Sequence, residues 1–275
     1  MRISSFYYQI SYATVENRLS LSKAFETAVE NGIQDIVLDA EWMESNIATE
    51  TRIFLNNYGL SRSVYGAPIC DFSSEEGYRA ALSRFEGFIK MTEMVGAKHF
   101  MIVPRIDLQG KTAKRIKNET ECIRNMFFDV SRLCVKYGIC PTVENYSITD
   151  YPFTTISDIK WLLDNVPDLM FNIDTGNFTL VGEDEVEAAR LFADKIVKAH
   201  IKDVKTVERS TLVRGGKCFD CAVLGTGETR NEEVLDILNK AGYNGELTIE
   251  VSQPYFERTL ESAKWMKEVL KKYDN

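Results

Sequence analysis

Eight short segments rich in apolar and β-branched residues alternate with longer amphipathic segments along the whole chain. Most of the short segments are nearly continuous apolar runs, which is typical of parallel strands buried on both faces. In the longer segments, apolar residues recur at helical spacing, as Leu260, Ala263 and Met266 do in the last one. The expected strands are Ile3–Ile10, Asp35–Ala40, Ser61–Tyr65, His99–Val103, Pro141–Glu144, Met170–Asp174, Val197–Ile201 and Glu246–Val251. This alternation predicts an α/β protein in which a helix connects each strand to the next.

The length of the chain, taken with this alternation, predicts a closed barrel. Eight strand–helix units in 275 residues have about 34 residues each, and (β/α)8 barrels are commonly of about this size. An open, doubly wound sheet is the alternative, but the early glycine-rich phosphate turn typical of that fold is absent. No linker or change in composition divides the sequence. We therefore predict a single domain over residues 1–275, folded as a (β/α)8 TIM barrel.

Acidic residues outnumber basic ones, 41 Asp and Glu against 33 Lys and Arg, which gives a net charge of −8. A nucleic-acid partner would require clustered basic charge, so we expect none. No apolar run approaches the ~20 residues that span a bilayer, and the N-terminus lacks the apolar core of a signal peptide. The six cysteines are scattered through a chain that is large enough to fold without disulfides. These features predict a reduced, cytoplasmic protein with no membrane partner.

The segment Cys218-Phe219-Asp220-Cys221 has the spacing of a zinc knuckle or a redox pair. A four-ligand zinc site needs a second pair of ligands, and the sequence offers neither another such pair nor a nearby histidine. We therefore interpret the two cysteines as part of a turn in a long, solvent-facing loop.

The ends of strands five to eight each carry one side chain that can bind a metal: Glu144, Asp174, His200 and Glu250. In a (β/α)8 barrel, functional groups come from the carboxyl ends of the strands, so these four belong to one rim. Taken singly, a carboxylate at a strand end often caps the next helix, and a lone histidine is often a core residue. Four such residues on consecutive strands favour a site for one divalent ion, with Mn²⁺, Mg²⁺, Co²⁺ or Zn²⁺ as candidates. His99 stands at the start of its strand, so we interpret it as a structural residue at the barrel floor.

Other side chains near the same rim are candidates for substrate binding. Arg105 follows the fourth strand and is able to hold a phosphate or carboxylate, with a plain surface charge as the equal alternative. Lys202 lies two residues after the histidine of strand seven and so shares its face of the strand. Glu41 and Tyr65 end strands two and three, where an aromatic ring either stacks on a sugar or belongs to the core.

These strand ends resemble the xylose isomerase-like TIM barrel superfamily, which contains sugar isomerases and epimerases, inosose dehydratases and endonuclease IV. The resemblance covers nearly the whole chain. It is most specific at Glu144-Asn145, Ile173-Asp174-Thr175-Gly176-Asn177, His200-Ile201-Lys202-Asp203, Leu224-Gly225-Thr226-Gly227 and Ile249-Glu250. The resemblance implies that Glu144, Asp174, His200 and Glu250 bind the metal. The endonuclease is excluded, because its trinuclear site draws on several histidines and this chain has two.

The function that the resemblance implies is a metal-dependent isomerase or epimerase of a ketose or related small sugar. Glu144 and Glu250 would remove and return a proton through an enediolate, with one divalent ion, Mn²⁺ foremost, as cofactor. The first alternative is a lyase that dehydrates an inosose-like or dehydroshikimate-like ketone, since elimination begins with the same proton abstraction. A barrel that only binds a ligand is the second. The partner is in each case a small molecule, and the sequence leaves open whether the chain forms a homo-oligomer.

One position departs from the family pattern. The family's epimerases and endonuclease have a histidine three residues after the strand-six aspartate, and here that residue is Asn177. Asparagine is able to bond a substrate hydroxyl but is a poor metal ligand. We therefore expect Asn177 to contact substrate and expect no second metal ion there.

Overall fold

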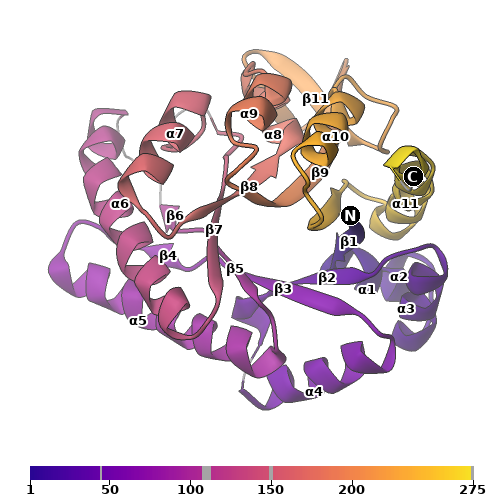
Figure 1. The fold of residues 1–275 in the computed structure, drawn as a ribbon, viewed down its shortest axis with the longest axis horizontal. Coiled ribbons are helices and arrows are strands. Elements are labelled where there is room, and N and C mark those ends of the chain that lie inside the picture. Colours follow the sequence, from indigo (N-terminus) through magenta and orange to yellow (C-terminus); the bar gives the residue numbers. More distant parts are fainter. Residues whose placement is uncertain (44, 107–112, 149–150, 274–275) are drawn as a thin grey trace.

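Eight parallel strands form a closed barrel with the helices outside it in the computed structural model, which describes residues 1–43, 45–106, 113–148 and 151–273 (Figure 1). Each strand pairs with its neighbours in parallel, and the pairing of β1 with β12 and of β8 with β9 completes the circle. The barrel strands are β1 (Arg2–Phe6), β2 (Asp35–Asp39), β3 (Ser61–Gly66), β5 (His99–Ile102), β7 (Cys140–Glu144), β8 (Met170–Asp174), β9 (Ile196–Val207) and β12 (Glu246–Glu250). The predicted (β/α)8 fold is confirmed.

The helices lie between successive strands, and the two longest are α5 and α6. Local signals set their limits: the Thr155 side chain and Asp158 form a capping box at the start of α7, and Gly96 ends α5 in the left-handed conformation. Within the described part of the chain, none of the helices combines the length and apolar character needed to cross a bilayer. The helices are α1 (Tyr7–Ser11), α2 (Ala13–Glu16), α3 (Leu21–Glu30), α4 (Ser45–Asn57), α5 (Glu75–Val95), α6 (Ala113–Lys136), α7 (Ile156–Asn165), α8 (Thr175–Val181), α9 (Glu185–Leu191), α10 (Asn231–Lys240) and α11 (Tyr255–Leu270). Two 3-10 turns, Ala40–Trp42 and Lys271–Tyr273, and a short pair of strands, β4 (Ile69–Cys70) and β6 (Arg105–Ile106), complete the fold.

Two predicted segments were wrong in extent or kind. The first strand ends at Phe6, because the chain turns into helix α1 where the apolar run predicted more strand. Strand β9 runs six residues beyond its predicted end at Ile201 and leaves the barrel. There it pairs with the antiparallel strand β11 (Lys217–Ala222), which pairs in turn with β10 (Leu212–Arg214). The cysteines predicted to lie in a loop therefore lie on a strand.

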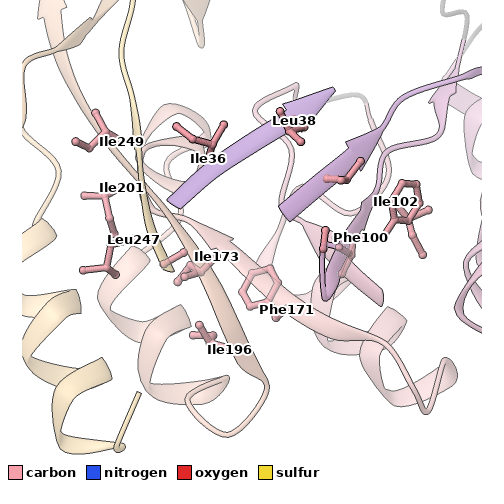
Figure 2. Close-up of a cluster of buried hydrophobic side chains, with 14 of the residues drawn as sticks. Ile36, Leu38, Phe100, Ile102, Phe171, Ile173, Ile196, Ile201, Leu247 and Ile249 are labelled. Atoms are coloured by element: carbon pink, nitrogen blue, oxygen red, sulfur yellow. The ribbon is translucent and has the colours of Figure 1, made fainter. Parts of the chain in front are cut away.

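The apolar core lies between the barrel and its helices, and Figure 2 shows part of it. Successive side chains of a strand point to opposite faces, so the positions between these core residues face the barrel interior. The core residues labelled in Figure 2 are Ile36, Leu38, Phe100, Ile102, Phe171, Ile173, Ile196, Ile201, Leu247 and Ile249. Buried polar residues occupy the alternate positions: Ser4, Asp35, Ser63, Thr142, Asn172, His200 and Thr248. The barrel therefore has an apolar outside and a polar inside, and the functional groups belong to that inside.

Candidate metal centre

Four side chains from four neighbouring strands meet inside the carboxyl end of the barrel. Glu144, Asp174, His200 and Glu250 each offer one ligand atom, and these atoms lie within 4.8 Å of one another. They meet because each residue takes an inward position at the carboxyl end of the barrel: Glu144, Asp174 and Glu250 end β7, β8 and β12, and His200 lies on β9 where that strand leaves the barrel. Strand register helps, since Asp174 is the cross-strand partner of His200. The structure thus brings together the four residues predicted as metal ligands.

His200 is buried between the carboxylates. Its Nδ1 lies 2.7 Å from Oε1 of Glu144 and 3.6 Å from Oε2 of Glu250, and Asn172 Nδ2 lies 3.0 Å from its Nε2. Burial lowers the pKa of His200 to about 4, although the negative charges of Glu250 and Asp174 oppose this shift. A neutral imidazole has one nitrogen lone pair, which it can offer to a metal ion.

The carboxylates show an excess of negative charge. Burial raises the pKa of Glu144 to about 7, and the charge of Glu250 adds to the rise. Burial also raises the pKa of Asp174, against the opposing effect of the Lys202 ammonium. One oxygen of Asp174, Oδ2, is buried and accepts no hydrogen bond, and it forms an ion pair with the Lys202 ammonium 2.8 Å away. A divalent cation would relieve both conditions, so the donor set fits a metal ion such as Mn²⁺, Mg²⁺, Co²⁺ or Zn²⁺.

Lys202 and Asn177 contact this cluster directly. The Lys202 ammonium nitrogen lies 2.8 Å from Asp174 Oδ2 and 2.6 Å from Glu250 Oε1, and it donates to Asn177 Oδ1 at 2.9 Å. Burial alone would lower the pKa of Lys202, but the charges of Asp174 and Glu250 raise it well above its ordinary value. Lys202 is therefore a fixed positive charge beside the four candidate ligands.

Asn145 connects the ends of β7 and β8. Its side chain donates to the Asp174 carbonyl oxygen at 2.9 Å and accepts the Asp174 N–H at 2.8 Å, while the Asn177 side chain donates to the Asn145 carbonyl oxygen at 2.9 Å. Asp174 Oδ1 in turn accepts the Asn177 N–H and caps helix α8. Side chains beyond the ligand set orient it in this way. The sequence motif contained Asn145, but the sequence did not indicate this role.

Aromatic rings form one side of the centre. The Phe6 ring lies 5.1 Å from the His200 ring, edge to face, and also packs against Tyr8 and Tyr65. Tyr255 packs against Tyr8, with 5.3 Å between the ring centroids. Prediction from sequence placed Tyr65 here but missed Phe6 and Tyr255. Phe6 was missed because the predicted first strand ran on to Ile10, whereas the strand ends at Phe6.

Arg105 and Glu41 form a separate pair at the rim. Arg105 Nη2 lies 3.5 Å from Glu41 Oε1, and about half of the Arg105 side chain is exposed. Tyr65 is nearer to the centre and donates through its hydroxyl to Asp39 Oδ2 at 2.9 Å. The five predicted substrate residues thus lie in three places: beside the ligands, in the aromatic side and at the outer rim.

Asp203 organises the Leu224-Gly225-Thr226-Gly227 turn that follows the hairpin. Its carboxylate accepts the N–H groups of Gly225, Gly227 and Thr229 at 2.9, 2.9 and 3.1 Å. Gly225 has φ +82°, and a Cβ there would lie 2.2 Å from Nε1 of Trp265. This part of the motif therefore shapes the backbone.

The β10–β11 hairpin is attached beside the centre. Arg258 Nη1 donates to the Cys221 carbonyl oxygen at 2.7 Å and to Ser252 Oγ at 2.6 Å, and pairs with Asp220. Cys218 and Cys221 are free thiols, and their odd spacing on a strand directs them to opposite faces. That geometry argues against a shared metal or a disulfide.

Solved structures with the same fold include enzymes and a metal-bound protein. A D-psicose 3-epimerase from Clostridium cellulolyticum H10 is 14% identical, with a TM-score of 0.77 over 98% of this chain and 99% of that one. The IOLI protein, solved with a zinc atom bound, is 17% identical, with a TM-score of 0.76 over 99% of each chain. At these identities the likeness shows the fold.

Sequence comparison gives the family. An inosose isomerase from Halalkalibacterium halodurans is 20% identical over 259 residues, which cover 91% of this chain and 89% of that protein. The sequence pattern of one family matches residues 23–269. Because this match spans most of the barrel and all four candidate ligands, the chain belongs to the xylose isomerase-like TIM barrel family.

Proposed function

We propose that this protein is a metal-dependent isomerase or epimerase of a ketose or a related small polyol ketone. The observation that carries the proposal is the cluster of three carboxylates and one neutral imidazole, with ligand atoms within 4.8 Å of one another. Glu144, Asp174, His200 and Glu250 would hold one divalent ion, most readily Mn²⁺, with Mg²⁺, Co²⁺ and Zn²⁺ as further candidates. Such an ion, when bound, is a Lewis acid that acidifies a C–H bond next to a carbonyl group.

The two glutamates are the groups that would move the proton. Glu144 ends β7 and Glu250 ends β12, with β8 and β9 between them in the barrel wall. One carboxylate removes the proton from carbon, which leaves an enediolate, and the other returns a proton from the opposite side and so inverts the centre. A dication bound by Glu144 would favour its ionised form, which is the form that accepts a proton. The pair can therefore complete a reaction that neither adds nor removes atoms.

The surroundings of the cluster fit a neutral sugar-like molecule. Aromatic rings such as Phe6 and Tyr65 would face C–H groups, and Asn177 would bond a hydroxyl. We keep as predicted substrate contacts three further residues: Glu41, Arg105 and Lys202. The names of two similar proteins, an inosose isomerase and a D-psicose 3-epimerase, support this class of substrate.

The test is a screen of ketoses and keto-inositols in D₂O with Mn²⁺ present. We expect turnover to place one deuterium on a single carbon of the product, without loss of water, as read by NMR and mass spectrometry. Glu250→Gln is the matched control and should give no deuterium incorporation. A product lighter by one water would instead establish the lyase, because elimination begins with the same proton abstraction and differs in the next step.

A further inference from the structure

A buried ammonium group stands among the candidate metal ligands. Lys202 is 6% exposed, and a buried charge is tolerated only where opposite charges and hydrogen bonds compensate it. The compensation comes from three oxygens, on Asp174, Glu250 and Asn177, at 2.6 to 2.9 Å from the nitrogen. The ammonium donates a hydrogen bond to Asn177 Oδ1 and forms ion pairs with the other two oxygens, so it is held on three sides.

The segment from Asp174 to Asn177 is shaped around this lysine. Thr175 Oγ1 accepts a hydrogen bond from the backbone N–H of Lys202 at 3.1 Å and donates one to the backbone carbonyl oxygen of Lys202 at 3.0 Å. Gly176 leaves room for the side chain, because a Cβ there would lie 2.6 Å from Lys202 Cγ and 2.8 Å from its Cβ and Cδ. Both the backbone and the side chain of Lys202 are thus held in place by the residues that follow the strand-six ligand.

The charges of the centre show what this arrangement does. In the ionised form that binds a cation, three carboxylates and one ammonium have a net charge of two negative charges, which one divalent ion neutralises. We propose that Lys202 is a built-in counter-cation of the centre, which sets its charge for a single dication and holds one oxygen each of Asp174 and Glu250. As a positioning residue, it lowers the affinity for the ion by repulsion and stabilises the ion-free protein by attraction to the carboxylates.

This inference rests on the proposed function, since it assumes that the four ligands bind a divalent ion. The counter-cation role of Lys202 differs from a role as a substrate contact, because a substrate contact needs an ammonium N–H that is free to reach the substrate. The two roles predict different results without any substrate present, and calorimetry of metal binding separates them.

The experiment titrates Mn²⁺ into protein stripped of metal, using wild type, Lys202→Met and Gly176→Ala. We expect Lys202→Met to bind Mn²⁺ at least about tenfold more tightly than wild type, because a neighbouring positive charge has gone. We also expect it to melt at a lower temperature in EDTA and to gain more from added Mn²⁺. Gly176→Ala should change both quantities in the same direction by less, because it displaces the ammonium without removing it. Lys198→Met, which removes another buried ammonium from β9, is the matched control and should tighten Mn²⁺ binding much less, because Lys198 pairs with Glu246 and contacts none of the four candidate ligands.

The outcomes separate the two proposals. Unchanged or weaker Mn²⁺ binding in Lys202→Met, with normal binding in wild type, overturns the counter-cation role alone. If Lys202→Met does not fold without metal, Gly176→Ala decides in the same way. If wild type binds no Mn²⁺, the metal centre itself is wrong, and the inference falls with it.

Discussion

The strands β9 and β12 carry the same pair of charged residues at both ends of the barrel. Lys198 and Glu246 are cross-strand partners at the amino end of the barrel strands, which we call the floor. Lys202 and Glu250 are cross-strand partners at the carboxyl end, which we call the mouth. The ammonium–carboxylate distances are similar, 2.8 Å at the floor and 2.6 Å at the mouth. Residue type and pairing therefore do not distinguish the two ends.

The further charges around each pair do distinguish them. At the floor, Asp35 adds a carboxylate, and Arg2 supplies a matching cation 2.9 Å from it. At the mouth, Glu144 and Asp174 add two carboxylates, and Lys202 is shared between Asp174 and Glu250. The floor is balanced within the protein, and the mouth has an excess of negative charge.

The pKa values follow this difference. Burial favours the neutral form of both Glu246 and Glu144, but the Lys198 and His99 charges hold the pKa of Glu246 well below its ordinary value. The pKa of Glu144 is raised to about 7. A buried cluster that satisfies its own charges is structural, whereas one that leaves a charge excess is suited to bind an ion.

The largest effect should come from removing the proton-transfer groups at the mouth. Glu144→Gln and Glu250→Gln should each lower kcat by about 10³-fold or more, because the base in the chemical step is lost. Turnover of the substrate identified in the screen measures this, with circular dichroism as the check of folding. Near-wild-type turnover in either variant would show that its role is wrongly assigned.

The two histidines of the chain allow a direct test of mouth against floor. His200→Ala should weaken Mn²⁺ binding by more than about a hundredfold, since even groups that orient ligands are worth about 10- to 100-fold. His99→Ala, 3.6 Å from Glu246 at the floor, should leave binding near wild type. Elemental analysis after dialysis against Mn²⁺ should give about one ion per chain in wild type and His99→Ala. Equal metal content in His200→Ala would contradict the proposed site.

For the free energy of unfolding, we expect a large effect at the floor, where little effect on metal binding is expected. Lys198→Met should lower the free energy of unfolding by about 3 to 5 kcal/mol, because it leaves Glu246 buried without its cation. Added Mn²⁺ should not restore the difference from wild type, since the ion binds at the other end. Urea unfolding with and without Mn²⁺ measures both values. Full rescue by Mn²⁺ would mean that the two clusters are not independent.

The smallest effects should come from the cysteines of the hairpin beside the mouth. Cys221 packs with Leu180, Val204 and Phe219, so Cys221→Ser should cost about 1 kcal/mol in unfolding free energy. Cys218→Ser should cost less than about 0.5 kcal/mol, as at most surface positions. Metal content should not change in either variant. A drop in bound metal would show that the hairpin, unlike the floor, contributes to the centre.

The fold was predictable because its signals are local. The buried strand Met170–Asp174 matches its predicted bounds, and the four ligands follow from their places at strand ends. Helix α1 was missed because a short apolar run does not distinguish strand from helix. The extension of β9 was missed because it depends on a partner strand, β11, whose pattern is not apolar.

The surroundings of each ligand were less predictable. The oxygens around Lys202 come from β8, α8 and β12, which are far apart in the sequence. The packing of Phe6 on His200 likewise joins residues that are far apart in the sequence. Sequence position shows which groups reach the mouth, and only the closed barrel shows which of them touch.

The length of strand β9 divides it into two sections with different neighbours. It is one uninterrupted strand of 12 residues that begins at the floor, passes through the centre at His200 and continues into the hairpin. Its barrel section is bonded to β8 and β12, and its outer section to β11. The inner section is therefore held by its two neighbouring barrel strands, and the outer section is held by the hairpin strand β11. A change in β10 or β11 should alter the surroundings of the centre while the four candidate ligands keep their positions.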